Sequence, residues 1–235
     1  MNKDLTYSKF KDLLGKSKRN SDPLFCRYFL RPLSFPIGWI FYSLGIRANS
    51  ISLISIVVTV IACLLIIFGE NQEITLASFL MIFVALLDCV DGNVARARGE
   101  TGPAGEWMDA LSGYTVYALL PISLGIGIQI ESQSDDLVGI WIIVGSITVI
   151  SNLYSRLLYQ KYMNSFSEMT TKDEFKGDKS LFAIVSSEIG LVGWMMPALL
   201  FASFVNKVHL YMLFYSFMYV VSALVVALVL VRKVN

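Results

Sequence analysis

The sequence has few of the charged residues that soluble proteins carry on their surfaces. Only 16% of its 235 residues are charged, whereas 55% are hydrophobic, and the net charge is +1. Such a composition is too apolar for a soluble domain and is typical of an integral membrane protein. The near-zero net charge gives no indication of a nucleic-acid partner, and we expect none.

Cysteines, internal repeats and removable leader segments are also scarce. The three cysteines, Cys26, Cys63 and Cys89, are scattered and odd in number, so we expect reduced thiols rather than a disulfide framework. No signal-peptide pattern follows the basic start of the chain, so residues 1–22 are expected to remain as a cytosolic basic tail that contacts anionic lipid. The absence of a visible repeat argues against a transporter built from duplicated halves.

Six long apolar stretches dominate the rest of the sequence. Each is near the ~20 residues that a helix needs to cross a bilayer, and they cover approximately Asn49–Gly69, Ile74–Arg96, Gly105–Ile130, Leu137–Tyr159, Glu188–Asn206 and Val208–Val231. Before them, residues 24–46 mix aromatic residues with arginine, proline and glycine, a pattern that favours a helix lying along the membrane surface. We predict an all-α integral membrane protein with six transmembrane helices and an N-terminal amphipathic interfacial helix, in which residues 23–235 form a single membrane domain.

The distribution of basic residues predicts the orientation of these spans. If the amino terminus is cytosolic and the spans alternate, all of the 19 Lys and Arg residues except Lys207 lie on the cytosolic side. This is a strong positive-inside pattern. It predicts a multi-pass protein with both termini in the cytosol.

Three carboxylates lie within or against the apolar stretches. They are Asp88, Asp91 and Asp109, and an acid in such a place is costly enough to suggest a function. Asp88 and Asp91 share one helical face, and the helix-breaking residues in 99–103 turn the chain back so that Asp109 can approach them. A divalent cation would keep three clustered acids ionised, and oxygen ligands suit Mg²⁺, Mn²⁺ or Ca²⁺. The alternative is that the acids are polar packing groups or residues at helix ends.

The stretch that begins at Asp88 resembles the signature of the CDP-alcohol phosphotransferase (CDP-alcohol phosphatidyltransferase) family. That signature is D-x-x-D-G-x-x-A-R-(x8)-G-x-x-x-D-x-x-x-D. Seven of its eight fixed positions match at the right spacing, namely Asp88, Asp91, Gly92, Ala95, Arg96, Gly105 and Asp109. The eighth position, an aspartate in the family, is Gly113 here. Farther upstream, Asn49 lies in a segment that resembles the family's P-N-x-I-T, with Ala48 in place of the proline.

The resemblance implies a membrane transferase that depends on Mg²⁺ or Mn²⁺. It would move a substituted phosphoryl group from a CDP-linked donor to a lipid or small-molecule acceptor, either an alcohol or a phosphate-bearing molecule, and release CMP. Such a reaction belongs to the synthesis of phospholipids or related conjugates. The resemblance also implies a homodimer. The charge pattern puts the acids, and so the active site, at the cytosolic face, and we expect a bacterial or archaeal plasma membrane.

Residue roles follow from the resemblance position by position. The three aspartates would bind metal, and the nucleotide and donor would be bound by Gly92, Ala95, Arg96, Gly105 and Asn49. Gly92 would let the donor approach the backbone, and Arg96 offers phosphate a planar fork of donors. The alternative role of Gly92 and Gly105 is to let helices pack closely. The alternative role of Asn49 is to cap the amino-terminal end of a helix. Arg156 and Lys161 match acceptor-binding positions by place alone, and anchoring at the membrane surface is their alternative role.

Gly113 limits how much of the family's chemistry can be transferred. The resemblance implies that the missing aspartate is the base that deprotonates an acceptor hydroxyl. Glu106 lies about two helical turns away, and Ser112 and Tyr114 project from other faces. Three explanations stay open: an acceptor that is already ionised, a base from another helix or from substrate, or a non-catalytic CDP-alcohol-binding membrane subunit. A cation transporter is a further alternative, but that function would explain only the three carboxylates and not the spacing of Gly92, Arg96 and Gly105.

The predicted orientation can be tested by labelling single cysteines from outside the cell. A cysteine at Ser134 should react with an impermeant reagent, because the loop that contains it is predicted to be external. A cysteine at Thr171 should react only after the membrane is made permeable. The opposite pattern would overturn the orientation.

Overall fold

The computed structural model describes residues 6–14, 22–132, 139–165 and 187–234. All regular structure in these residues is helical, and six helical segments are long and apolar enough to cross a membrane. The predicted all-α fold with six spans is therefore confirmed. The labelling positions Ser134 and Thr171 lie outside the described residues.

The six segments follow the predicted order. They are α3 (Ala48–Phe68), α4 (Asn71–Arg98), α5 (Pro103–Ser132), α6 (Ile140–Ser165), the segment Ser187–Phe204 with η2 (Leu191–Met195) and α9 (Met196–Phe204), and α10 (Val208–Val234). α6 continues beyond its predicted end at Tyr159, because residues 160–165 contain neither proline nor glycine to stop it.

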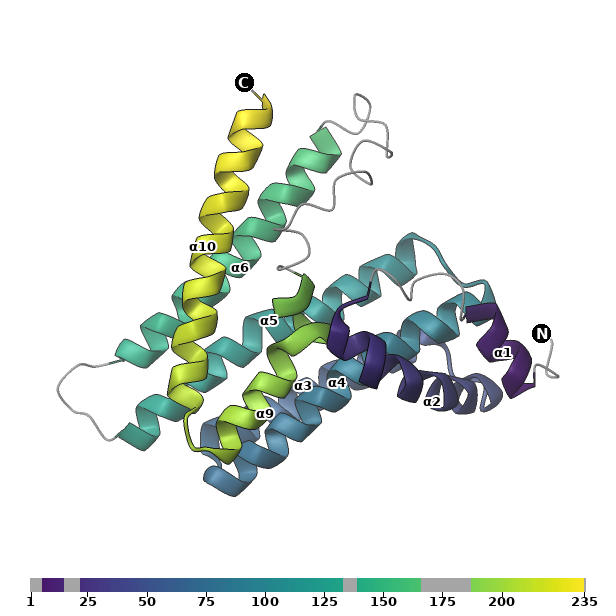
Figure 1. Cartoon of the computed structure of the whole chain (residues 1–235), viewed down its shortest axis with the longest axis horizontal. Helices are drawn as coiled ribbons and strands as arrows, with labels where there is room; N and C mark the ends of the chain where they lie inside the picture. The colour runs from purple at the N-terminus through teal and green to yellow at the C-terminus, as the bar shows by residue number, and fades with distance from the viewer. Residues whose placement is uncertain (1–5, 15–21, 133–138, 166–186, 235) are drawn as a thin grey trace.

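The helices pack in neighbouring pairs around α3 and α5. α3 packs against both α4 and α5, α5 packs against α6, and α6 packs against α10 (Figure 1). α6 and α10 run side by side and extend beyond the other spans. Gly127 of α5 lies so close to the carbonyl of Ile66 in α3 that no side chain would fit between them. Small residues commonly allow such close approach in membranes.

Apolar side chains fill the centre of the bundle and also cover its outside. Val84, Val116, Leu120 and Met195 are buried, whereas many leucines, valines and phenylalanines on α3 and α10 are exposed. An apolar outer surface is suited to lipid, and helices satisfy their own backbone hydrogen bonds there.

The predicted surface helix forms over most of its expected length. η1 (Cys26–Leu30), a π-helical turn, continues directly into α2 (Arg31–Ser43), which packs against α4. The Glu188 carboxylate accepts hydrogen bonds of 2.9 and 3.1 Å from the Leu24 amide, so it satisfies an otherwise unpaired donor at the helix start. The location of this helix at the membrane surface stays a prediction.

The amino-terminal tail contains a helix that the sequence analysis did not foresee. α1 (Tyr7–Leu14) buries Phe10 and Leu14 and packs against α2 and α4. The ring centroids of Phe10 and Tyr42 are 5.8 Å apart. The signal was the helical spacing of the apolar residues in α1, but the basic residues around it suggested only a lipid-contacting tail.

The predicted hairpin between α4 and α5 is present. Gly99 has left-handed backbone angles, φ 67° and ψ 22°, which end α4 and which glycine adopts without strain. Pro103 then begins α5. This turn brings Asp109 to the end of α4 that carries the other two aspartates.

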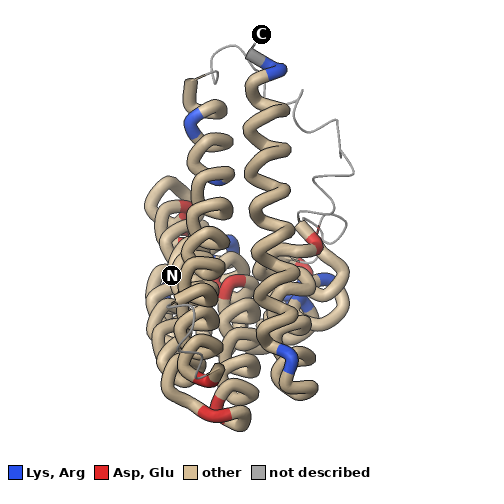
Figure 2. Tube along the Cα trace, turned by 90° about the vertical axis from the view of Figure 1, so that its left-hand side faces the viewer, with Lys and Arg blue, Asp and Glu red and all other residues tan. Residues whose placement is uncertain are grey.

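Basic residues gather towards one end of the bundle, whereas acidic residues occur at both ends (Figure 2). Figure 2 shows basic residues near the carboxyl terminus and acidic residues at turns of the opposite end. The last turns of α4 and α10 are basic, and α4 begins next to Glu70 and Glu73. The cytosolic location of the basic end stays a prediction from the sequence.

Candidate functional site

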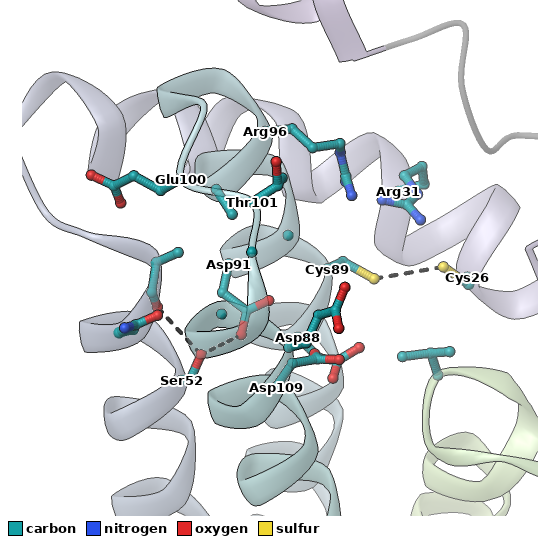
Figure 3. Close-up of a pocket in the computed structure, with 18 of the residues that line it drawn as sticks. Cys26, Arg31, Ser52, Asp88, Cys89, Asp91, Arg96, Glu100, Thr101 and Asp109 are labelled. Carbon is teal, nitrogen blue, oxygen red and sulfur yellow. Dashed lines mark hydrogen bonds between the residues drawn. The ribbon is translucent and has the colours of Figure 1, made fainter. Parts of the chain in front are cut away.

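The three motif aspartates line one cavity of about 370 Å³. Asp88 and Asp91 come from α4, Asp109 comes from α5, and Asn49 and Ser52 of α3 complete this side of the cavity (Figure 3). Asp91 and Asp109 are both close enough to Asp88 to interact with it electrostatically. The hairpin therefore brings the three acids to a common space, as predicted.

Asp91 is held in place by a hydroxyl from α3. Ser52 Oγ donates a hydrogen bond of 2.7 Å to Asp91 Oδ2, and the aspartate side chain is 5% exposed. Ser52 also bonds the Ala48 carbonyl of its own helix. The sequence analysis did not name Ser52 as a site residue, although its place three residues after Asn49 was a signal.

The acids share a cavity but are not drawn together into a closed ligand cluster. Within the part of the chain that the structure describes, no group of three His, Cys, Asp or Glu side chains is arranged to hold a metal ion. Mutual repulsion of carboxylates favours such a separation, and a divalent cation would reduce it. Carboxylate and hydroxyl oxygens still fit a hard cation such as Mg²⁺ or Mn²⁺.

All five residues predicted to bind the nucleotide and donor also line the cavity. They are Asn49, Gly92, Ala95, Arg96 and Gly105. A side chain at Gly92 would lie 3.4 Å from the guanidinium of Arg96, which folds back over this part of α4.

Arg96 is half-buried and only partly paired. Its Nη2 donates to Asn93 Oδ1 at 2.8 Å, whereas its Nε has no hydrogen-bond partner among the described residues. An unpaired donor of this kind is costly unless a ligand supplies the acceptor. An anionic group in the cavity would supply it.

Several cavity residues were missed by the sequence analysis, and Arg31 is the most important. It comes from α2 and pairs with Asp22, with Nε to Oδ2 at 2.8 Å and Nη2 to Oδ1 at 3.0 Å. Burial opposes the charged form, but the hydrogen bond with Asp22 counters burial and the pKa of Arg31 is raised. No local pattern connects Arg31 with the motif, because the contact joins segments far apart in sequence.

Two of the three cysteines also line the cavity. Cys26 Sγ and Cys89 Sγ are 3.6 Å apart, and both thiols are free and buried, as is Cys63. The reduced state of the three thiols stays a prediction. Cys89 lies at a variable motif position, and its packing partner from η1 could not be read from the sequence.

Position 113 lies beside open space and outside the cavity lining. A side chain added at Gly113 would meet no atom within 4 Å. The neighbouring hydroxyls are engaged elsewhere, since Ser112 Oγ bonds Ser55 Oγ at 3.3 Å and Tyr114 Oη bonds Gln160 Oε1 at 3.3 Å.

Of the two acceptor candidates, the structure brings only Arg156 next to the face of α5 that carries Gly113. The Arg156 guanidinium lies 4.0 Å from the ring centroid of Tyr117, which is one helical turn after Gly113. Arg156 Nε donates to Asn152 Oδ1 at 2.8 Å, which fixes its orientation. Lys161 is exposed on α6.

Six apolar spans, with an acid-lined cavity at the end of α4, are typical of a multi-pass membrane protein. A family model described as CDP-alcohol phosphatidyltransferase matches residues 46–231, and the chain belongs to this family. The family consists of membrane transferases of phosphate-containing groups that generally depend on a divalent metal. A comparison with curated proteins found no match.

We expect cytidine nucleotide binding to require Mg²⁺ or Mn²⁺. Binding should depend strongly on the three cavity acids and less strongly on Ser52. Asp88→Asn, Asp91→Asn or Asp109→Asn should abolish metal-dependent CDP binding, because each removes a charged ligand. Ser52→Ala should weaken binding roughly fivefold to tenfold, the typical effect of one buried hydrogen bond. Ser78→Ala, which removes a buried hydroxyl that bonds only within α4, is the control. Unchanged CDP titrations in all three Asn variants would refute the site.

Proposed function

We propose that the protein transfers a substituted phosphoryl group from a CDP-linked donor to an anionic acceptor and releases CMP. The observation that carries the proposal is that all seven residues matching the family signature line the same cavity. Chance packing of buried polar groups would not collect the acids, the small residues and Arg96 around one space. The family match supports the general reaction class.

Each side of the cavity has a distinct part in the proposed reaction. Asp88, Asp91 and Asp109 would hold Mg²⁺ or Mn²⁺, which would supply positive charge opposite the donor diphosphate and the departing CMP. Arg96 would bind a donor phosphate through its unpaired Nε. Gly92 and Ala95 leave room for the nucleotide along α4.

The surroundings of Gly113 favour an acceptor that is already ionised. An acceptor phosphate or phosphonate needs no base, since at neutral pH at least one of its oxygens is already ionised. This oxygen would form a bond to the donor phosphorus, and the bond to the bridging oxygen of CMP would break with its electron pair. Arg156 lies over the ring of Tyr117, which is one turn after Gly113, and offers the acceptor a cation, whereas an aspartate at 113 would repel the acceptor.

A second candidate is a non-catalytic membrane subunit that binds CDP-alcohols. It is favoured by the same position, because Gly113 has no ionisable group and the hydroxyls of Ser112 and Tyr114 are bonded elsewhere. In that case the donor cavity would bind CDP and no acceptor would react. The homodimer, the role in phospholipid synthesis and the bacterial or archaeal plasma membrane stay predictions from the sequence.

We predict that Gly113→Asp changes which acceptor is used. The wild type should transfer to a phosphate acceptor and not to a hydroxyl acceptor. Gly113→Asp should raise turnover with a hydroxyl acceptor by roughly 10²–10⁴-fold, the usual contribution of a general base, and slow turnover with the phosphate acceptor. The added side chain meets open space, so the fold should tolerate it. Product analysis by mass spectrometry with one CDP-linked donor makes the comparison.

Gly113→Asn is the matched control, because it has the same shape as aspartate without the charge. It should produce neither effect, and the affinity for CDP should stay the same in all three proteins. Equal rates for wild type and Gly113→Asp with both acceptors would contradict a role for position 113. CDP binding without product from any acceptor would favour the second candidate.

Arg156 should act on the acceptor rather than on the donor. Arg156→Gln should raise the KM for a phosphate acceptor roughly tenfold or more, the cost of one lost charged hydrogen bond, and leave the Kd for CDP unchanged. Lys161→Gln, on the exposed part of α6, should have a smaller effect. In a Gly113→Asp background with a neutral hydroxyl acceptor, Arg156→Gln should matter little. A weakened Kd for CDP in Arg156→Gln would argue against this role.

A further inference from the structure

Arg31 binds the carboxylate of Asp22 with one edge of its guanidinium group, inside the cavity proposed to hold the donor. Its Nε and Nη2 hold both oxygens of Asp22, and its Nη1 donates to Asn93 Oδ1 at 3.4 Å. The side chains of Arg31 and Asp22 are only 15% and 11% exposed. Both residues line the cavity that contains the motif aspartates (Figure 3).

Arg31 and Arg96 are held next to one another by a single acceptor. Both guanidinium groups donate to Oδ1 of Asn93, and the Asn93 amide in turn donates to Ser34 Oγ at 2.9 Å. Asn93 is 1% exposed and Ser34 is fully buried, so this arrangement is fixed within the packed interface of α2 and α4. Two like charges in such proximity repel unless anions compensate them.

Asp22 is hydrogen-bonded to only one of the two guanidinium groups. It pairs with Arg31, whereas Arg96 keeps an unpaired Nε. A diphosphate carries enough charge to satisfy both guanidinium groups, and phosphate oxygens match the planar fork of arginine as carboxylate oxygens do. Asp22 therefore occupies a position in the cavity that suits a phosphate group.

We propose that Arg31 is a second phosphate-binding residue of the donor site, and that the Asp22 carboxylate occupies this position until the donor diphosphate displaces it. The proposal rests on the proposed CDP-linked donor. Only the Asp22 side chain has to turn away, because Asp22 precedes the helix that begins at Leu24 and its carbonyl is held separately by Arg27 Nη2 at 3.3 Å. Donor binding then replaces the internal Arg31–Asp22 ion pair. The donor phosphate and the Asp22 carboxylate therefore do not have to lie side by side.

A double-mutant cycle on the full chain tests the exchange by direct binding. The Kd for CDP is measured with Mg²⁺ present in wild type, Asp22→Asn, Arg31→Gln and the double variant. Asp22→Asn should tighten binding roughly tenfold by removing the internal competitor, and Arg31→Gln should weaken it by a similar factor, as expected for charge-assisted hydrogen bonds. In the Arg31→Gln background, Asp22→Asn should have little effect, because the competition acts through Arg31.

Glu100→Gln is the charge-matched control. Glu100 is an exposed acid that lines the same cavity, and the one ion pair found among the described residues, Arg31 with Asp22, does not include it. Its neutralisation should tighten CDP binding clearly less than Asp22→Asn does. An equal gain would mean general charge repulsion and would overturn the proposal.

The remaining outcomes separate this proposal from the proposed function. Weaker or unchanged CDP binding in Asp22→Asn, with normal binding in wild type, would overturn the exchange alone, since Asp22 would then position Arg31 or have no role. The exchange would also be overturned if Asp22→Asn still tightened CDP binding in the Arg31→Gln background. Absence of CDP binding in wild type would overturn both proposals. If Arg31→Gln does not fold, Arg31→Lys keeps the charge, loses the planar fork and should still weaken binding.

Discussion

The site depends on the electrostatic cost of gathering carboxylates at the end of an apolar helical bundle. Asp88 and Asp91 lie in a candidate span, and Asp109 approaches them from the next one. Neighbouring carboxylates repel, most strongly where burial limits their screening by water, as it does at Asp91. The Ser52 hydroxyl, which bonds Asp91, and the two arginines that line the same cavity offset part of this cost. Those groups make a cavity that suits a cation and a phosphate-bearing ligand together.

The cavity is assembled from segments that are distant in the sequence. α3 packs against α4 and α5 and supplies Ser52, while α2 packs against α4 and supplies Arg31. Asn93 joins the two arginines, and Glu188 joins the start of the surface helix to the segment before η2. The surface helix is thus part of the site and not only an anchor. Displacing it would move Arg31 away from the motif.

Position 113 illustrates how one charge can decide between two kinds of acceptor. A carboxylate can remove a proton from a hydroxyl, but it repels an acceptor that is already anionic. The glycine leaves open space on the face of α5 where Arg156 stacks on Tyr117. A phosphate-bearing acceptor needs a cation such as Arg156 to bind it, and it does not need an aspartate at position 113 to remove a proton. The loss of the family's aspartate is therefore compatible with an active enzyme that uses another substrate class.

The sequence alone predicted the six spans, the hairpin at Gly99 and the motif residues that line the cavity, because apolar length, helix breakers and short spacings are local properties. Only the tertiary structure added the packing of α1 against α2 and α4, the Ser52–Asp91 bond, the Cys26–Cys89 contact and the Arg31–Asp22 pair. It also separated Arg156, beside α5, from the exposed Lys161. These features join residues from different helices, and their contacts are set by how the helices pack, which no single segment encodes.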